Sequence, residues 1–466
     1  MLFHSQIFLL LFLPVALLGY YRLAVKGRSG VWWLSAASFV FYGYWDLRLL
    51  PLLAGSIAVN WMFAQGYMRA RGFDGDRRYL VPLGVFLNLL VIGVFKYADF
   101  FSDSLAWLNG GEHAPWSIIL PLGISFFTFQ QISYLVDLKR EAAPAYRFRD
   151  YVLYVSFFPQ LIAGPIVRHN EFIFQLKHDP LREGLSERLS RGLVLLLIGL
   201  VKKVFVADRL AQMADPVFAQ AAAGQAITAA DAWMADIAFG LQIYFDFSGY
   251  SDMAIGLALM FGFTLPINFK APYAAASIRE FWRCWHMTLS RFLRDYLYIP
   301  LGGSRHGALR HGLALIITML LGGLWHGANW TFVAWGGAHG LGLAANTLWD
   351  RYRLRALPRP VGWVATFVFV FSVWVLFRAE SFDAALSLYS AMALMGAKMG
   401  SLTSLEQAVL LAGGLAVATL GPCSQDVARK ILRPRPAVAV ISALALVAVL
   451  LQVGLGRNIE FIYFQF

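Results

Sequence analysis

Long apolar stretches separated by short, basic connections dominate this chain and limit the folds open to it. A helix that crosses a bilayer needs about 20 mostly apolar residues. Only 14% of the residues are charged, whereas soluble domains carry about 25%. The sequence therefore predicts an all-α, polytopic integral membrane protein. The candidate spans are residues 2–20, 31–45, 49–66, 80–97, 117–136, 192–207, 232–260, 311–327, 331–348, 361–378, 402–421 and 437–455.

The basic residues gather in alternate connections, which predicts an orientation. The stretch 2–20 has no Lys or Arg before Arg22 and no clear cleavage site, so we interpret it as a retained first span. With the N-terminus on the outer side of the membrane, most Lys and Arg fall in the inner connections, as the positive-inside rule requires. The formal charge of +12 is then explained by topology, and no nucleic-acid partner is needed.

Two segments are unlike spans. Residues 151–167 are apolar but are interrupted by Pro159, Gln160 and Gly164, and basic residues flank them. We predict a re-entrant segment, since irregular backbone at membrane depth must be surrounded by protein or by a water-filled cavity. Residues 269–310 are too charged to span. No repeat of fixed period is evident, which weakens an interpretation as a transporter with inverted repeats.

Residues 277–298 are predicted to form one amphipathic helix at the membrane surface. Ser277 and Glu280 have the spacing of a capping box. Basic side chains would share an arc of roughly 140°. This face would either attach to anionic lipid or dock a phosphate-bearing acyl donor such as coenzyme A or a carrier's phosphopantetheine. The residues on the arc are Arg279, Arg283, His286, Arg291 and Arg294.

His326 is the leading candidate for chemistry. It lies in the run GGLWHGANW, residues 322–330, between two apolar stretches, and an ionisable group at membrane depth is a functional hypothesis by default. Burial favours the neutral ring, which can take a proton from a hydroxyl that attacks a thioester or ester carbonyl. The alternative is a structural histidine that hydrogen-bonds two helices. We expect Gly322, Gly323 and Gly327 to admit a thin acyl–thioester chain, and the glycine-flanked His339 to serve helix packing.

Further polar residues occur inside apolar sequence. Asp246, Ser248 and Asp252 belong to the run YFDFSGYSD. The two aspartates lie about 120° from sharing a helical face unless Gly249 breaks the helix. A polar cavity wall is the favoured interpretation, although a proton-coupled transporter can use the same residues. Cys284 and Cys423 fit neither a metal-binding spacing nor a disulfide framework, so we expect no metal and no bound cofactor.

Taken in order, these motifs resemble the membrane-bound O-acyltransferase family, specifically its bacterial alginate O-acetyltransferase-like branch. The resemblance implies a single domain over residues 1–466, with a ring of about 11 to 12 tilted helices and re-entrant or interfacial segments around a central funnel. Its parts would be residues 1–136, the core motifs at 137–310, the histidine helices at 311–348, and 361–466. The motifs are LFLP (11–14), FFPQLIAGP (157–165), YFDFSGYSD (244–252), FWRCWH (281–286), RDYLYIPLGG (294–303), GLWHGA (323–328) and FIYFQF (461–466).

The resemblance also implies roles. His326 matches the family's catalytic histidine, and His286 matches a second polar position that is His or Asn among relatives. The family's activity implies acetyl transfer from acetyl-CoA or a carrier thioester at the cytoplasmic face of the inner membrane. A periplasmic partner protein would complete transfer to an exported polysaccharide such as alginate, although cellulose and peptidoglycan stay open. Candidates for donor binding are Arg279, Arg283, Arg294, Trp285 and Trp325, and candidates for a cavity wall are Asp246, Ser248, Asp252, Gln160 and Asn329.

Two alternatives to this enzyme are kept. A polysaccharide exporter or flippase would share the topology and the intramembrane polar groups but would need no thioester. A non-catalytic subunit of a synthase complex would tolerate the loss of both His286 and His326.

Overall fold

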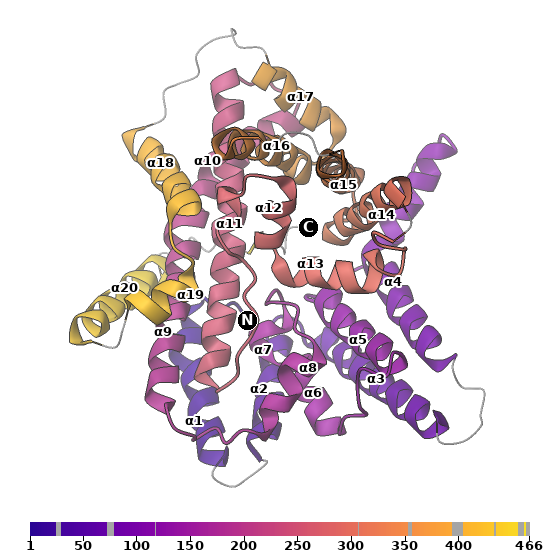
Figure 1. The fold of residues 1–466 in the computed structure, drawn as a ribbon. Helices are drawn as coiled ribbons and strands as arrows, with labels where there is room; N and C mark the ends of the chain where they lie inside the picture. The colour runs from indigo at the N-terminus through magenta and orange to yellow at the C-terminus, as the bar shows by residue number, and fades with distance from the viewer. Residues whose placement is uncertain are drawn as a thin grey trace. The chain divides into compact units, whose positions relative to one another are not determined.

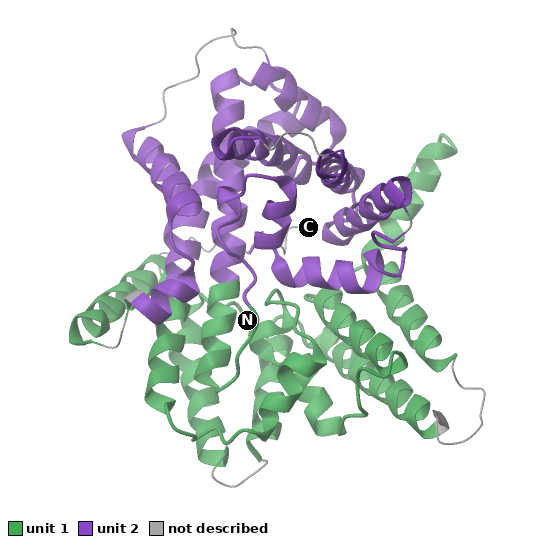
Figure 2. Ribbon diagram, viewed as in Figure 1, with its two compact units in different colours: residues 1–197, 251–266, 432–457 green, residues 198–250, 267–431, 458–466 purple. Residues whose placement is uncertain are grey.

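The computed structural model describes residues 1–24, 29–71, 79–116, 118–305, 307–352, 357–393, 404–432, 435–454 and 461–462. Within these ranges the chain is helical and contains no strand (Figure 1), so the prediction of an all-α fold is confirmed. The chain forms two compact units (Figure 2). Unit 1 comprises residues 1–197, 251–266 and 432–457, and unit 2 comprises residues 198–250, 267–431 and 458–466.

Unit 1 is built from the N-terminal helices together with α20. The last turns of the long helix α11 also belong to it. The helices of unit 1 are α1 Leu13–Ala24, α2 Ser29–Gly43, α3 Leu50–Arg71, α4 Leu80–Leu108, α5 Ile124–Lys139, α6 Phe148–Ser156, α7 Phe158–Leu161, α8 His169–Phe172, most of α9 Leu185–Val201, and α20 Pro436–Gly454. Short π- or 3-10 helices in this unit are Phe8–Phe12, Leu47–Leu49 and Ile173–Lys177.

Unit 2 holds the segments that carry the candidate site. Its helices are α10 Asp208–Ala222, most of α11 Ala229–Met260, α12 Ile278–Cys284, α13 Met287–Leu293, α14 Gly307–His326, α15 Trp330–Arg351, α16 Arg359–Arg378, α17 Phe382–Ala393, α18 Leu405–Leu420 and α19 Ser424–Asp426. Short π- or 3-10 helices are Lys202–Ala207, Pro272–Ala274, Arg294–Tyr298 and Val427–Ile431.

Every predicted span has a helix at its position, but not all of these helices meet strict criteria for crossing a bilayer. Among the described residues, five helices are long and apolar enough, or six if the bent pair of Leu405–Leu420 and Ser424–Lys430 is one span. Among the others, α2 and α5 are shorter and α11 carries several carboxylates. The sequence interpretation missed α10 and α17 as separate helices.

The predicted single helix over residues 277–298 is wrong. The capping box is real, since the Ser277 hydroxyl accepts a hydrogen bond from the Glu280 backbone N–H at 3.1 Å. The helix nevertheless ends at Cys284, and α13 begins at Met287 after a sharp bend at His286 (Figure 1). The common cationic arc therefore does not exist, because its members belong to two helices and a following π-helix.

The interrupted segment at 151–167 has the expected irregular backbone. It divides into α6 and α7, with the break at Phe157, and its apolar residues are buried. Side chains satisfy the backbone groups that the break exposes. The Phe158 N–H donates to Ser38 Oγ at 3.0 Å, and Gln160 Nε2 donates to the Tyr154 carbonyl at 2.6 Å. Gln160 therefore has a structural role within unit 1.

Candidate active site

The hairpin of α14 and α15 places His326 at a helix end. The connection is short, and Asn329 caps α15 by accepting a hydrogen bond from the Thr331 N–H at 3.0 Å. Asn329 Nδ2 also donates to the Glu380 carbonyl at 2.9 Å. The oxygen and the nitrogen of the Asn329 amide therefore both hold the turn that follows His326. This is a structural role, in addition to the predicted role at a cavity wall.

Glycines bring α14 and α15 into close contact. A Cβ atom at Gly323 would overlap the Phe332 carbonyl and the Gly336 backbone, and one at Gly327 would overlap the Phe332 ring. The expectation that Gly323 and Gly327 leave room for an acyl–thioester chain is therefore wrong, because the opposing helix occupies that space. The nearest atom to a Cβ at Gly322 is Leu293 Cδ1, at 3.2 Å.

His326 is enclosed by aromatic rings. Its side chain is buried, and its ring centroid lies 4.9 Å from that of Trp325, 5.3 Å from Trp335 and 5.3 Å from Phe377. The Trp335 and Phe377 rings meet it edge to face. Such surroundings keep bulk water away from the ring.

His286 lies close to His326 in the same unit. The two ring centroids are 6.4 Å apart, and the Trp325 centroid is 6.1 Å from that of His286. His286 is completely buried, not exposed on a cationic face, and burial lowers its pKa from 6.5 to about 3. The structure therefore brings together the two histidines that the motifs singled out.

Asn268 contacts His286 and was missed by the sequence interpretation. Its Oδ1 lies 3.2 Å from His286 Nδ1, 3.2 Å from the Thr288 backbone N and 2.9 Å from Thr288 Oγ1. Asn268 is fully buried. No spacing rule in the sequence links it to His286, because the contact joins a segment outside any helix to a helix start 18 residues later.

The predicted donor-binding residues differ in their surroundings. Arg279 forms an ion pair with Asp350, and Arg294 pairs with Asp295 at 2.6 Å. Arg283 is exposed and makes no ion pair within the described part of the chain. Trp285 is 1% exposed and packs 5.1 Å, centroid to centroid, from Trp374. A role for these residues in donor binding stays a prediction.

The predicted cavity-wall residues do not form one group. Helix α11 continues through Gly249, so Asp246 and Asp252 face different directions and belong to different units. Asp246 belongs to a buried ion-pair cluster, in which Lys203 Nζ lies 3.1 Å from Asp246 and 2.8 Å from Asp208. Asp246 also accepts a hydrogen bond from the Ile462 N–H at 2.8 Å. Ser248 lies within hydrogen-bond distance of Lys202 Nζ, at 3.3 Å.

His339 has the structural role that its glycine-rich surroundings predicted. It is fully buried, and its Nδ1 accepts a hydrogen bond from Trp282 Nε1 at 3.1 Å. The Phe281 ring stacks on it at 5.9 Å between centroids, with an interplanar angle of 7°. It therefore joins α12 to α15 and provides a buried histidine against which His326 can be compared.

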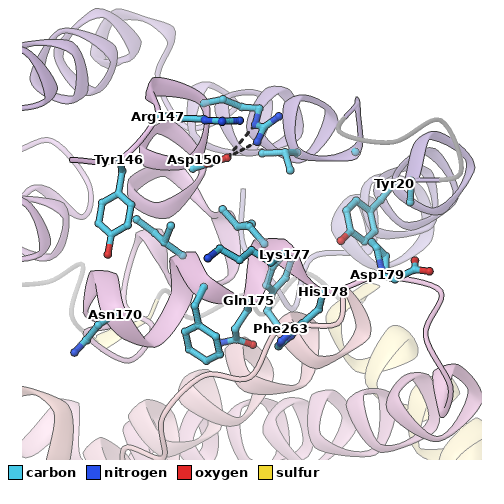
Figure 3. A pocket seen from close by; sticks show the side chains of 18 of the residues that line it. Tyr20, Tyr146, Arg147, Asp150, Asn170, Gln175, Lys177, His178, Asp179 and Phe263 are labelled. Carbon is cyan, nitrogen blue, oxygen red and sulfur yellow. Dashed lines mark hydrogen bonds and ion pairs between the residues drawn. The ribbon is translucent and has the colours of Figure 1, made fainter. Parts of the chain in front are cut away.

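Unit 1 contains a separate cavity of about 1050 Å³. Its wall includes Arg147, Lys177 and His178, together with an Arg149–Asp150 ion pair of 2.7 Å (Figure 3). Tyr146 also lines it, and its hydroxyl lies 2.8 Å from His169 Nδ1.

Comparison with known proteins gives consistent matches. A model of the membrane-bound O-acyltransferase family matches residues 124–389. The chain is 41% identical over 424 residues to a peptidoglycan O-acetyltransferase of Helicobacter pylori, covering 84% of this chain and 80% of that protein. It is 43% identical over 435 residues to a probable alginate O-acetylase of Azotobacter vinelandii, covering 90% and 85%. A teichoic acid D-alanyltransferase of Streptococcus thermophilus is 26% identical over 356 residues, covering 74% and 83%.

Proposed function

Since the chain belongs to the membrane-bound O-acyltransferase family, we propose that it moves acetyl groups from a cytoplasmic thioester toward an exported polysaccharide. It is a multi-pass membrane enzyme and an acyltransferase. The acceptor is proposed from two similar proteins, a peptidoglycan O-acetyltransferase and a probable alginate O-acetylase. The donor is acetyl-CoA or an acyl-carrier thioester, and the N-terminus lies in the periplasm of an inner-membrane protein.

The observation that carries this proposal is the pair of buried imidazoles, His286 and His326, 6.4 Å apart between centroids. Neutral imidazole is the side chain best matched to proton transfer near neutral pH. Two such rings from separate elements can both contact one substrate oxygen that lies between them. Aromatic walls reduce hydrolysis of a thioester by excluding water.

The proposed reaction uses His326 as general base. The acceptor hydroxyl gives its proton to His326 as its oxygen attacks the thioester carbonyl carbon. The carbon–oxygen bond forms, the carbon–sulfur bond breaks, and the thiolate leaves with the proton from His326. The products are an O-acetyl ester and a free thiol, and His326 is again neutral. A periplasmic partner protein would then transfer the acetyl group from this ester to a hydroxyl of the polymer, which releases the first hydroxyl again.

Two features support an anionic, phosphate-bearing donor. Arg283 is exposed and unpaired within the described part of the chain. The unit 1 cavity presents Arg147 and Lys177, for which no ion pair is found among the described residues. Guanidinium and ammonium groups bind phosphate through charge-assisted hydrogen bonds. Both sites lie in segments assigned to the cytoplasmic side by charge.

The test compares His326→Ala with His339→Gln in a strain that makes the acetylated polymer. We expect His326→Ala to abolish polymer acetylation at normal protein level in the membrane, since the base is lost. His339→Gln removes another buried histidine of the same unit and should retain acetylation per folded protein. Polymer export is measured separately.

Each outcome decides between the candidate functions. If the His326→Ala strain exports a normal amount of polymer without acetyl groups, the result supports the acyltransferase. Loss of export with unchanged acetyl content per polymer would favour the exporter or flippase. Normal acetylation and export in both His326→Ala and His286→Ala would leave only a non-catalytic subunit.

A further inference from the structure

The Asn268 side-chain oxygen is a shared acceptor at the start of α13. Three groups surround it: the Thr288 backbone N at 3.2 Å, Thr288 Oγ1 at 2.9 Å and His286 Nδ1 at 3.2 Å. The amide is fully buried, so water does not compete for these contacts.

The backbone contact decides which way the amide points. Oxygen and nitrogen of an Asn side chain are assigned from their hydrogen-bond partners. A backbone N–H only donates, so the Asn268 atom that faces Thr288 N must be the carbonyl oxygen. That oxygen only accepts. His286 Nδ1, which faces the same oxygen, must therefore carry a proton.

This assignment fixes the other ring nitrogen. In a neutral imidazole one nitrogen carries the proton and the other carries a lone pair. With the proton on Nδ1, the lone pair is on Nε2. His286 Nε2 is buried, and no hydrogen-bond partner for it is found within the described part of the chain. Burial keeps the ring in its neutral form, because it lowers the pKa of His286 to about 3.

Asn268 also holds the backbone of His286. His286 is in the left-handed region, with φ 40° and ψ 52°, a conformation that costs a residue with a Cβ roughly 1 to 2 kcal/mol. The Asn268 carbonyl accepts a hydrogen bond from the Met287 N–H at 2.9 Å. The Asn268 side chain caps α13 through Thr288 N, whereas the His286 side chain makes no capping bond. One residue therefore fixes both the backbone and the ring of His286.

We propose that Asn268 is a positioning residue that holds His286 with its proton on Nδ1 and its lone pair on Nε2. In this tautomer His286 accepts a hydrogen bond at Nε2 and cannot donate one there. It can hold a substrate hydroxyl or thiol, but it cannot stabilise an oxyanion. The tautomer is independent of the proposed function, whereas its effect on acetyl transfer rests on that function.

The tautomer is measured directly by ¹⁵N NMR of histidine-labelled protein in nanodiscs. The His286 signals are assigned by their loss in His286→Asn. We expect a protonated Nδ1 and an unprotonated Nε2 in the native protein, and the same pattern in Asn268→Asp, which keeps an acceptor oxygen. Asn268→Leu removes the acceptor and should move the proton, wholly or partly, to Nε2.

A matched control removes a buried amide elsewhere. Asn88 donates to Asn60 Oδ1 at 2.6 Å and to the Gly84 carbonyl at 2.7 Å in unit 1. Asn88→Ala should leave the His286 signals unchanged. The proposal would be overturned if His286 of the native protein carried its proton on Nε2. This measurement does not require any Asn268 variant to fold.

Kinetics test the consequence for the reaction. We expect Asn268→Leu to lower kcat by about 10- to 100-fold, as loss of an orienting partner does at other sites, with KM for the donor little changed. Asn268→Asp should recover most of the rate. A changed tautomer with unchanged kcat would overturn the positioning role. Absence of acetyl transfer by the native protein, with the tautomer as stated, would reject the proposed function alone.

Discussion

The imidazole rings of His286 and His326 lie 6.4 Å apart between centroids, at an interplanar angle of 58°. This separation is larger than a direct hydrogen bond between two ring nitrogens allows. His286 is held at the bend between α12 and α13, and His326 at the end of α14. Neither ring therefore activates the other directly, and their cooperation depends on a group that contacts both.

Burial of His286 makes the stability of the protein pH-dependent. The unfolded ring takes up a proton near pH 6.5, whereas in the folded protein its pKa is about 3. The stabilisation is therefore fully present above pH 6.5 and is lost as the pH falls below it, by about 1.4 kcal/mol per unit. Between pH 7 and pH 5, the free energy of unfolding of His286→Asn should therefore fall by about 2 kcal/mol less than that of the native protein. Unfolding in detergent measures this, and parallel pH curves would contradict it.

Removal of Lys203 should destabilise unit 2 strongly. Lys203→Met leaves Asp208 and Asp246 buried without their common cation, which typically costs about 3 to 5 kcal/mol. Lys430→Met is the control, since its 2.8 Å pair with Asp426 is largely exposed and should be worth at most about 1 kcal/mol. Adding Asp208→Asn and Asp246→Asn to Lys203→Met should recover part of the loss. Equal effects of the two lysine substitutions would refute a structural role for the cluster.

Gly323→Ala should disturb the contact between α14 and α15. The added methyl group would overlap the Phe332 carbonyl and the Gly336 backbone, neither of which can rotate away. We expect a lower melting temperature and reduced acetylation, because His326 follows three residues later. Gly413→Ala in α18 is the control, since no atom lies within 4 Å of its added Cβ, and replacing a helical glycine by alanine is stabilising by about 1 kcal/mol. A neutral Gly323→Ala would show that the helices can separate at no cost.

Charge reversal distinguishes the two candidate donor sites. Arg283→Glu tests the exposed arginine of α12, and Lys177→Glu tests the wall of the unit 1 cavity. Each replaces attraction to phosphate by repulsion, so the substitution at the true site should raise KM for the donor by about tenfold or more at low salt. The increase in KM should be smaller at high salt. An unchanged KM in both variants would place the donor elsewhere.

The sequence predicted the helices well, because long apolar stretches and basic connections are local signals. Motifs singled out His286 and His326, which the structure brings close together, and the surrounding glycines predicted the packing role of His339. The sequence did not predict the bend at His286, since the capping box and the helical spacing of the arginines both favour a continuous helix. The contacts of Asn268 and Lys203 could not be found either, because each joins segments that are far apart in the chain.

The roles of the site residues, the donor and the orientation of the N-terminus stay predictions, as do the single-domain organisation and the central funnel. These depend on substrates, on a membrane and on a partner protein, which residue spacing alone does not specify. The glycines at 323 and 327 illustrate the difficulty. The same residue type serves an opening or a close contact, and only the position of the opposing helix decides between them.

The backbone conformation of His286 also limits which amino acids can replace it. Among residues with a Cβ, Asn, Asp and His adopt positive φ several times more often than the others, and β-branched side chains are strongly disfavoured there. The bend between α12 and α13 thus selects residue types before any chemistry does. We therefore expect the protein to fold with Asn or Gly at position 286 and to fold poorly with Val or Ile there. Only among the tolerated residues does activity then report on the ring itself.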